Sequence, residues 1–348
     1  MIKKPLGKTD LLVSELCLGT MTWGKQNTQE EAFDQLDAAM EYGINFIDTA
    51  EMYAVPAEAS TYGTTETILG HWFKARKHRD KVILASKIAG PGAPGWIGHI
   101  RGGLTRFSSK DIDAAIEGSL KRLQTDYLDL YQLHWPERNT NFFGKLGYRH
   151  KEEESFTDFC ETLTALQKHV KAGNIRHIGV SNETPWGVMR FLAAAESLGL
   201  PRIESVQNPY SLLNRSYEIG LAEVSCREQV SLLAYSPLAF GMLSGKYHNG
   251  PWPENARLTL FKQFSRYSNE QAIQATEAYL KLAQQKGLNP AQMALAFVRQ
   301  QHLVTSTIIG ATSMEQLTTN MESSQLTLDA ETLKALEAIH VIHPNPAP

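Results

Sequence analysis

The chain has 348 residues, with 34 Lys and Arg against 37 Asp and Glu and a formal net charge of −3. Apolar residues make up 42% and charged residues 20%, as in an ordinary water-soluble globular protein. This balance provides no basic surface for nucleic acid or anionic membrane. Three widely spaced cysteines favour free thiols over a disulfide framework. Because the chain lacks a signal-peptide core and a membrane-length apolar run, we expect a cytoplasmic protein.

A short hairpin is predicted first, over residues 2–13, around the turn Gly7-Lys8-Thr9-Asp10. Short apolar runs rich in β-branched residues follow and alternate with helical patterns. These predicted strands cover residues 15–18, 44–48, 82–87, 127–134, 175–181, 203–208, 231–236 and 307–310.

Several predicted helices have recognisable ends. Thr28 and Glu31 form the pattern of a capping box, and Gly43 follows the last turn of the same helix. Near the carboxyl end, Asn289 precedes a helix with Pro290 in its first turn, where a missing N–H is tolerated. These signals place helices between the predicted strands.

The alternation predicts the fold class. Parallel strands need a crossover, usually a helix, so eight strands separated by helices indicate a parallel sheet. Eight units of about 30–45 residues match a closed (β/α)8 TIM barrel better than an open sheet. No break in composition divides the chain, and we expect a single domain over residues 1–348.

Three connections are longer than a crossover requires: residues 89–107, 136–156 and 239–263. Each follows a strand and is therefore predicted on the carboxyl face, where such loops often build an active site. Ordinary variable surface loops are the alternative. The first loop contains GPGAPG, which spells the GxGxxG dinucleotide pattern, but Pro91 and Pro94 prevent the helix start that this pattern requires. We interpret it as an active-site loop.

Polar side chains gather where the predicted strands end. Any one of them could be a hydrogen-bonded structural group, but a separate explanation for each is improbable because burying polar groups costs free energy. Together they predict a functional site at the carboxyl end of the barrel. The residues are Asp48, Lys87, His134, Ser181, Asn182, Gln207, Asn208, Tyr235, Ser236 and Gly310.

A series of motifs carries a resemblance to a known family. In order they include LCLGTMTWG, GINFIDTAEMY, SLKRLQTDYLDLYQLHWP, GNIRHIGVSN, LLAYSPLAFGMLSGKY and IIGATSMEQLTTN. The sequence resembles the aldo-keto reductases, and within them the bacterial Tas-type proteins and the potassium-channel β subunits. The resemblance implies a (β/α)8 barrel that reduces aldehydes or ketones with NADPH.

The resemblance also implies a catalytic tetrad of Asp48, Tyr53, Lys87 and His134. Carbonyl reduction needs a proton at oxygen, and a free phenol with a pKa near 10 is a weak acid at neutral pH. An ammonium at Lys87 would lower the pKa of the Tyr53 hydroxyl. Asp48 would keep Lys87 charged, and His134 would orient the carbonyl oxygen or share the proton.

Cofactor contacts carry over in the same way. Ser181, Asn182 and Gln207 match contacts to the nicotinamide carboxamide, and Tyr235 matches the aromatic residue that stacks on the nicotinamide ring. Lys246 and Arg257 match cations near the 2′-phosphate. The full expected set is Thr20, Met21, Asp48, Ser181, Asn182, Gln207, Tyr235, Ser236, Pro237, Leu238, Gly241, Leu243, Lys246, Arg257, Gly310, Thr312, Gln316 and Asn320.

Three tryptophans are predicted to line the substrate pocket: Trp23, Trp96 and Trp135. All three follow strands, so they belong to the carboxyl face of a barrel. Aromatic walls favour a small apolar or aromatic carbonyl substrate over a sugar. Trp23 is the strongest candidate, whereas for Trp96 we favour packing under its own loop without contact to substrate.

Two other functions remain as alternatives. One is an NADP(H)-sensing regulatory subunit with weak reductase activity, but His134 disfavours it because the channel β subunits carry a different residue there. The other is Schiff-base chemistry at Lys87, which the neighbouring Tyr53 and Asp48 make remote. The histidines and cysteines lack metal-ligand spacing, so we expect no metal. We also expect no nucleic-acid or membrane partner.

Overall fold

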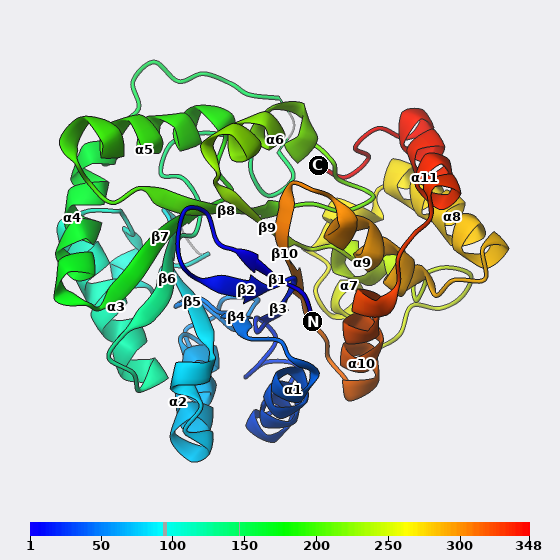
Figure 1. Cartoon of the computed structure of the whole chain (residues 1–348), viewed down its shortest axis with the longest axis horizontal. Coiled ribbons are helices and arrows are strands. Elements are labelled where there is room, and N and C mark those ends of the chain that lie inside the picture. The colour runs from blue at the N-terminus through cyan, green and yellow to red at the C-terminus, as the bar shows by residue number, and fades with distance from the viewer. Residues whose placement is uncertain (93–95, 146) are drawn as a thin grey trace.

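The computed structural model describes residues 1–92, 96–145 and 147–348. Its centre is a closed barrel of eight parallel strands in the order β10-β3-β4-β5-β6-β7-β8-β9 (Figure 1). The predicted (β/α)8 barrel is therefore confirmed. The strands are β3 (Leu16–Gly19), β4 (Phe46–Asp48), β5 (Ile83–Ile88), β6 (Leu128–Leu133), β7 (Ile175–Ser181), β8 (Ile203–Pro209), β9 (Ser231–Tyr235) and β10 (Val304–Ile309).

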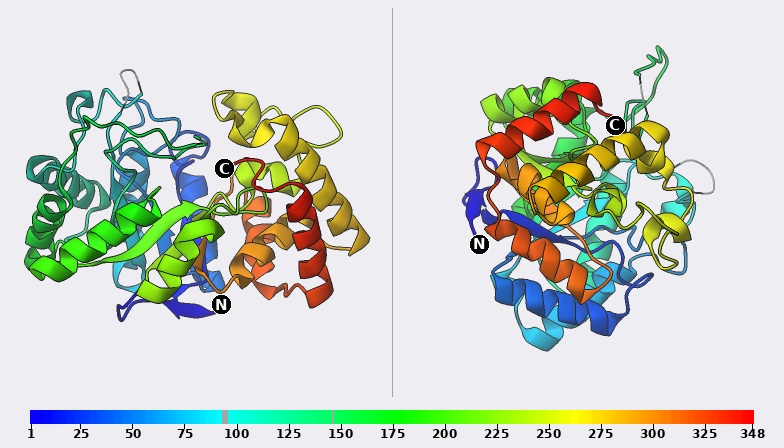
Figure 2. Two further views of the ribbon diagram at one scale, coloured as in Figure 1. Left: turned by 90° about the horizontal axis from the view of Figure 1, so that it is seen from above. Right: turned by 90° about the vertical axis from the view of Figure 1, so that its right-hand side faces the viewer.

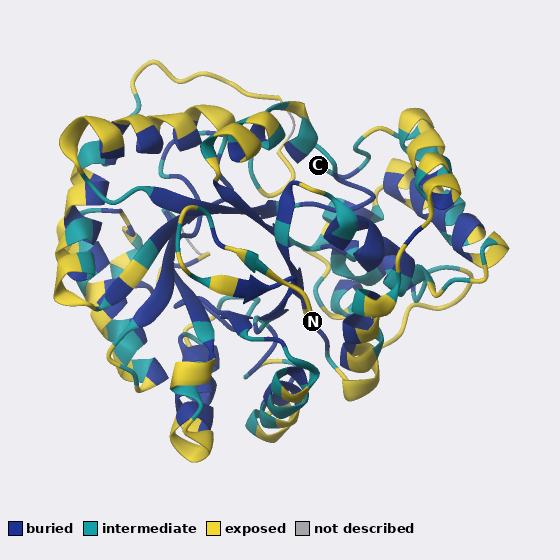
Figure 3. Ribbon diagram, in the orientation of Figure 1, coloured by how far each residue is buried: buried dark blue, intermediate teal, exposed yellow. Residues whose placement is uncertain are grey.

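Helices surround the barrel, and their inner faces are buried while their outer faces are exposed (Figure 3). The Thr28–Glu31 capping box is present, and Gly43 ends the same helix in a left-handed conformation, as predicted. The helices are α1 (Gln29–Tyr42), α2 (Thr64–Arg76), α3 (Ser109–Leu123), α4 (Phe159–Ala172), α5 (Pro185–Leu198), α6 (Tyr217–Glu228), α7 (Arg257–Leu260), α8 (Glu270–Gln285), α9 (Pro290–Gln300), α10 (Met314–Glu322) and α11 (Ala330–Ile342).

The predicted hairpin consists of β1 (Lys3–Pro5) and β2 (Leu12–Ser14), paired antiparallel. It lies across the amino end of the barrel (Figure 1), where the backbone N–H of Gly7 donates to Ser231 Oγ at 2.8 Å. Leu6 is fully buried with residues of the barrel interior. The hairpin therefore closes this end with apolar side chains.

The interior of the barrel changes from apolar to polar along its axis. Phe46, Ala85 and Leu130 belong to the apolar cluster in the interior. Side chains two positions apart on a strand share a face. The next inward positions on β4, β5 and β6 are thus Asp48, Lys87 and Gln132. Strand pairing places Lys87 opposite Gln132, so this polar layer lies toward the carboxyl face.

The segment between β9 and β10 is the longest connection between two consecutive strands of the barrel. It contains α7, α8 and α9, and together with α10 and α11 it extends the molecule on one side of the barrel (Figures 1 and 2). Among the described residues, no helix is both long and apolar enough to cross a membrane.

Candidate active site

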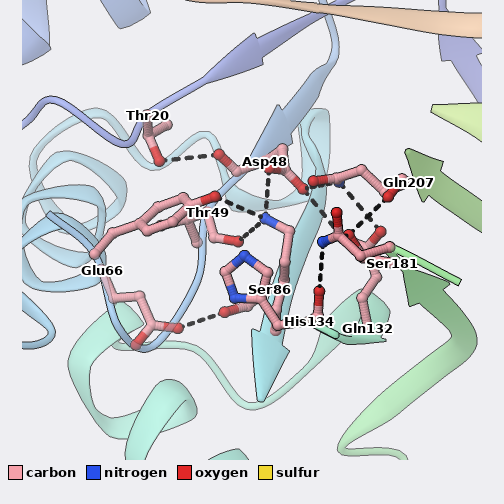
Figure 4. A network of polar contacts seen from close by, with 12 residues as sticks. Thr20, Asp48, Thr49, Glu66, Ser86, Gln132, His134, Ser181 and Gln207 are labelled. Atoms are coloured by element: carbon pink, nitrogen blue, oxygen red, sulfur yellow. Dashed lines mark hydrogen bonds and ion pairs between the residues drawn. The ribbon is translucent and has the colours of Figure 1, made fainter. Parts of the chain in front are cut away.

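A buried ion pair lies at the centre of the polar layer. Lys87 Nζ donates to Asp48 Oδ2 at 2.6 Å and to the Thr49 backbone oxygen at 2.7 Å. Lys87 is fully buried and Asp48 is nearly so. The second oxygen of this carboxylate also accepts hydrogen bonds, because Gln132 Nε2 and Gln207 Nε2 both donate to Asp48 Oδ1 (Figure 4). The carboxylate is thus held in a single orientation toward the ammonium.

This pairing keeps Lys87 charged. Burial alone would lower the pKa of the Lys87 ammonium, but Asp48 and Tyr53 raise it above its ordinary value. Lys87 Nζ lies 3.5 Å from the hydroxyl of Tyr53. Burial raises the pKa of that hydroxyl, and Lys87 opposes the rise. At neutral pH the site therefore presents a protonated phenol beside a positive charge.

His134 follows the last residue of β6, and its ring meets that of Tyr53 edge-on at 5.7 Å between centroids. Burial, assisted by Lys87, lowers its pKa well below the ordinary value, so the imidazole is neutral. In the part of the chain that the structure describes, its buried Nδ1 has no hydrogen-bond partner. The predicted tetrad is therefore brought together, with two hydrogen-bonding rings beside one ammonium.

The residues expected near the nicotinamide form a connected rim. Ser181 Oγ donates to the Gln207 backbone oxygen at 2.7 Å, and Asn182 Nδ2 donates to the His134 backbone oxygen at 2.8 Å. The Tyr235 hydroxyl donates to Asn182 Oδ1 at 2.6 Å. Hydrogen bonds thus hold these side chains next to His134.

The loop after β9 is a tight turn that contains several left-handed residues. Ser236, Ala239, Phe240 and Gly241 all have positive φ, and the backbone N–H groups of Ala239 and Gly241 donate to the carbonyl oxygens of Ser236 and Leu238. A Cβ at Gly241 would clash with the end of the Lys246 side chain. Glycine therefore allows this ammonium to approach the loop. The remaining expected residues of this loop, Pro237, Leu238 and Leu243, surround the same turn, and Leu243 is buried.

Lys246 and Arg257 lie close enough to repel each other. Burial and then Arg257 lower the pKa of Lys246, and burial also lowers the pKa of Arg257. Neither forms an ion pair with an acidic side chain within residues 1–92, 96–145 and 147–348. A pair of cations without an internal anion suits a phosphate dianion.

The residues expected at the adenosine end lie around the start of α10. Thr312 donates from its backbone N–H and its hydroxyl to Gln316 Oε1, both at 3.2 Å. Asn320 Nδ2 donates to the Gly310 backbone oxygen. Directly after the neighbouring strand β3, Thr20 Oγ1 donates to the Asp48 backbone oxygen, and Met21 follows it. These hydrogen bonds fix the backbone at the residues that we expect to contact the cofactor.

The tryptophans correct one prediction. Trp23 is fully buried in the main core, where its indole N–H donates to Gln35 Oε1 at 3.0 Å. It packs beneath its loop and has no surface to offer a substrate. Trp135 is also buried, beside His134, but Trp96 stacks on it at 5.0 Å and is 39% exposed. The aromatic wall therefore consists of Trp96 over Trp135, and residues 93–95 of the GPGAPG motif lie outside the described residues.

The sequence reasoning missed Glu51, which lies between Asp48 and Tyr53. Its buried carboxylate accepts two hydrogen bonds from Arg101, at 2.6 and 2.8 Å, and one from the Ala89 backbone. The pair ties the long loop after β5 to the segment that carries Tyr53. The sequence reasoning also missed Gln132. Glu51 and Gln132 are both polar residues inside otherwise buried runs, and the contrast with their apolar neighbours could have identified them.

Comparison with known proteins agrees with this geometry. The model of the Aldo/keto reductase family matches residues 15–341. The chain is 54% identical over 340 residues to Protein tas of Escherichia coli (strain K12), covering 98% of both chains. It is 33% identical to an uncharacterized oxidoreductase, YrpG, of Bacillus subtilis (strain 168), covering 96% of this chain and 94% of that protein. It is 29% identical to L-glyceraldehyde 3-phosphate reductase of Escherichia coli (strain K12), covering 95% and 90%. The resemblance inferred from the motifs is confirmed, and the chain belongs to the aldo/keto reductase family of oxidoreductases.

Proposed function

We propose that this protein reduces a small aldehyde or ketone to an alcohol with NADPH, using Tyr53 as the proton donor. The observation that carries the proposal is the Tyr53 hydroxyl, buried and protonated, 3.5 Å from a charged lysine at the carboxyl end of the barrel. A bound nicotinamide would supply the hydride to the carbonyl carbon. The protein's task is then to supply and control the proton at oxygen.

Each member of the tetrad has a defined part in that transfer. As Tyr53 gives up its proton, negative charge develops on its oxygen, and the neighbouring Lys87 ammonium stabilises that charge. Asp48 keeps the ammonium charged and fixed. His134 is neutral, so one ring nitrogen can donate a hydrogen bond to the carbonyl oxygen without competing as an acid.

NADPH is the proposed cofactor because of charge. Lys246 and Arg257 are mutually repelling cations, and a 2′-phosphate would neutralise both, whereas the 2′-hydroxyl of NADH would not. Gly241 lets the Lys246 ammonium approach the loop after β9, where the pyrophosphate of the cofactor would lie. The name of the relative that reduces L-glyceraldehyde 3-phosphate supports carbonyl reduction as the reaction class.

Replacement of the proton donor tests the proposal. Tyr53→Phe should lower kcat for aldehyde reduction by about two to four decades, because a positioned general acid contributes about that much to rate. NADPH binding, measured by fluorescence titration, should change little. Tyr131→Phe is the control, since it removes a buried hydroxyl that has no partner among the described residues. Near-normal turnover by Tyr53→Phe, or an equal loss in the control, would contradict the assignment.

A further inference from the structure

Arg266 is a partly buried arginine on the carboxyl face whose role is not yet assigned. Three arginines of the long loops there are neutralised by glutamates, in the pairs Arg101–Glu51, Arg106–Glu137 and Arg138–Glu183, and Arg149 is exposed to solvent. Lys246 and Arg257 are accounted for by the proposed cofactor. Arg266 lies in the segment after α7 and forms no ion pair with any acidic side chain in the described ranges. It is a guanidinium that the fold positions but does not neutralise.

Arg266 is connected to the catalytic corner through aromatic contacts. Its guanidinium carbon lies 6.0 Å from the centre of the Phe143 ring. Phe143 in turn contacts Trp135 at 5.8 Å, and Trp135 lies 4.9 Å from the His134 ring. Each step is a direct ring contact. The guanidinium is therefore next to the aromatic wall that ends at His134.

A second, polar route leads to the same arginine. Arg266 and Tyr235 are electrostatically coupled, since Arg266 opposes the rise that burial causes in the pKa of Tyr235, and Tyr235 raises the pKa of Arg266. The Tyr235 hydroxyl donates to Asn182, and Asn182 donates to the His134 backbone oxygen. Phe143 comes from the loop after β6 and Tyr235 from the end of β9. Because the two routes run through different loops and meet at Arg266 and His134, the arginine faces the same part of the carboxyl face as the tetrad.

The surroundings of Arg266 leave its charge available. Its guanidinium carbon lies 5.6 Å from the centre of the Tyr267 ring, and Tyr267 is fully buried. Burial alone would lower the pKa of Arg266, but Tyr267 and Tyr235 raise it, so it stays charged. An arginine next to aromatic rings keeps a planar fork of N–H donors that matches carboxylate and phosphate oxygens.

We propose that Arg266 binds an anionic group, a carboxylate or a phosphate, carried by the carbonyl substrate. The proposal rests on the reductase function above and names the class of its substrate. In this arrangement Trp96, stacked on the buried Trp135, contacts the carbon chain, the tetrad binds the carbonyl group, and Arg266 binds the anionic group. The substrate is then selected by its charge as well as by contact with the aromatic wall, whereas the sequence alone predicted a preference for apolar or aromatic substrates.

Matched pairs of substrates test the role of the charge. Each pair contains an anionic aldehyde and a neutral one: glyceraldehyde 3-phosphate with glyceraldehyde, and succinic semialdehyde with butanal. With NADPH as cofactor, kcat/KM is measured for both members, and the value for the anionic aldehyde is divided by the value for the neutral one. The ratio should favour the anion in the unaltered protein and fall about 10-fold or more in Arg266→Gln, mainly through KM. Arg266→Lys keeps the charge without the fork and should give an intermediate ratio. Arg106→Gln, which alters a guanidinium that is 44% exposed on the same face, should leave the ratio unchanged.

Two outcomes overturn the proposal. One is an equal ratio in the unaltered protein and in Arg266→Gln. The other is weaker NADPH binding by Arg266→Gln with no change in the ratio, which would assign the guanidinium to the nucleotide. Comparison of the two substrate pairs shows whether phosphate or carboxylate is preferred.

A binding measurement separates this proposal from the reductase function. Calorimetry with 4-hydroxybutanoate on the protein in the presence of NADP+ needs no turnover. If no carbonyl is reduced but the anion binds, and binds about 10-fold more weakly to Arg266→Gln, the reductase proposal fails and the anion site stands. If carbonyls are reduced but no anion binds, the anion site fails alone.

Discussion

The buried pair of Lys87 and Asp48 makes a strong prediction about stability. Both side chains are at least 96% buried and their charged atoms are 2.6 Å apart. Asp48→Asn keeps a carbonyl oxygen for the amides of Gln132 and Gln207 but leaves the Lys87 ammonium without its carboxylate. Removing one partner of a buried ion pair typically costs about 3–5 kcal/mol. Against a total stability of about 5–15 kcal/mol, that loss is large.

Urea denaturation at pH 7 measures the free energy of unfolding. The pH is chosen from the direction of the pKa shift. Because Lys87 has a raised pKa in the folded protein, the pair contributes fully below the unfolded-state pKa of about 10.4, and the contribution disappears only as pH rises through the folded-state value. Measurements at pH 7 therefore record the whole effect. Asp37→Asn, which breaks an exposed pair with Arg76, should shift the denaturation midpoint far less.

The double variant Asp48→Asn with Lys87→Met completes the test. Methionine has nearly the volume of lysine and no charge, so the stranded ammonium is removed. Since replacing both members of a buried pair is close to neutral, about 2 kcal/mol or more of the loss should be recovered. If the single variant loses less than about 1 kcal/mol, or the second substitution recovers nothing, then desolvation of Lys87 is not what makes Asp48 necessary.

Two further predictions concern the cofactor and the core. Lys246→Ala with Arg257→Ala should bring the dissociation constants for NADPH and NADH together, as fluorescence titration would record; equal constants in the unaltered protein would refute the assignment. Trp23→Ala should lower the free energy of unfolding by about 3–5 kcal/mol, because Trp23 is a core residue, while leaving KM for an aromatic aldehyde nearly unchanged. A selective rise in that KM without loss of stability would restore Trp23 to the substrate pocket; exposed Trp186→Ala is the control.

The barrel and the tetrad could be predicted from the sequence because both depend on regular spacing. Alternation of strands and helices defines a closed parallel sheet, and the carboxyl ends of its strands must meet at one face. Asp48, Lys87 and His134 each mark the end of such a strand, so their proximity follows from topology. Tyr53 came from the family motif, and the structure places it beside Lys87.

Residues within loops could not be placed in this way. Trp23 follows a strand as His134 does, but the turn after β3 directs its ring into the core, where Gln35 receives the indole N–H. The partner of Glu51 is 50 residues further along the chain, inside a loop with no periodic pattern. Arg266 lies between the last two motifs of the family resemblance and belongs to neither. Loop conformation is set by such long-range contacts, and a single sequence does not display them.

The segment between β9 and β10 contains all three cations to which we assign specificity. Lys246, Arg257 and Arg266 all belong to it, whereas Asp48, Tyr53, Lys87 and His134 belong to other loops and strands. Under the proposed assignments, the choice of cofactor phosphate and the choice of substrate charge both depend on one contiguous stretch of the chain, from Lys246 to Arg266. Exchange of that stretch between relatives would transfer both preferences at once and leave the proton-transfer residues untouched. In this fold, chemistry and selectivity can therefore diverge independently.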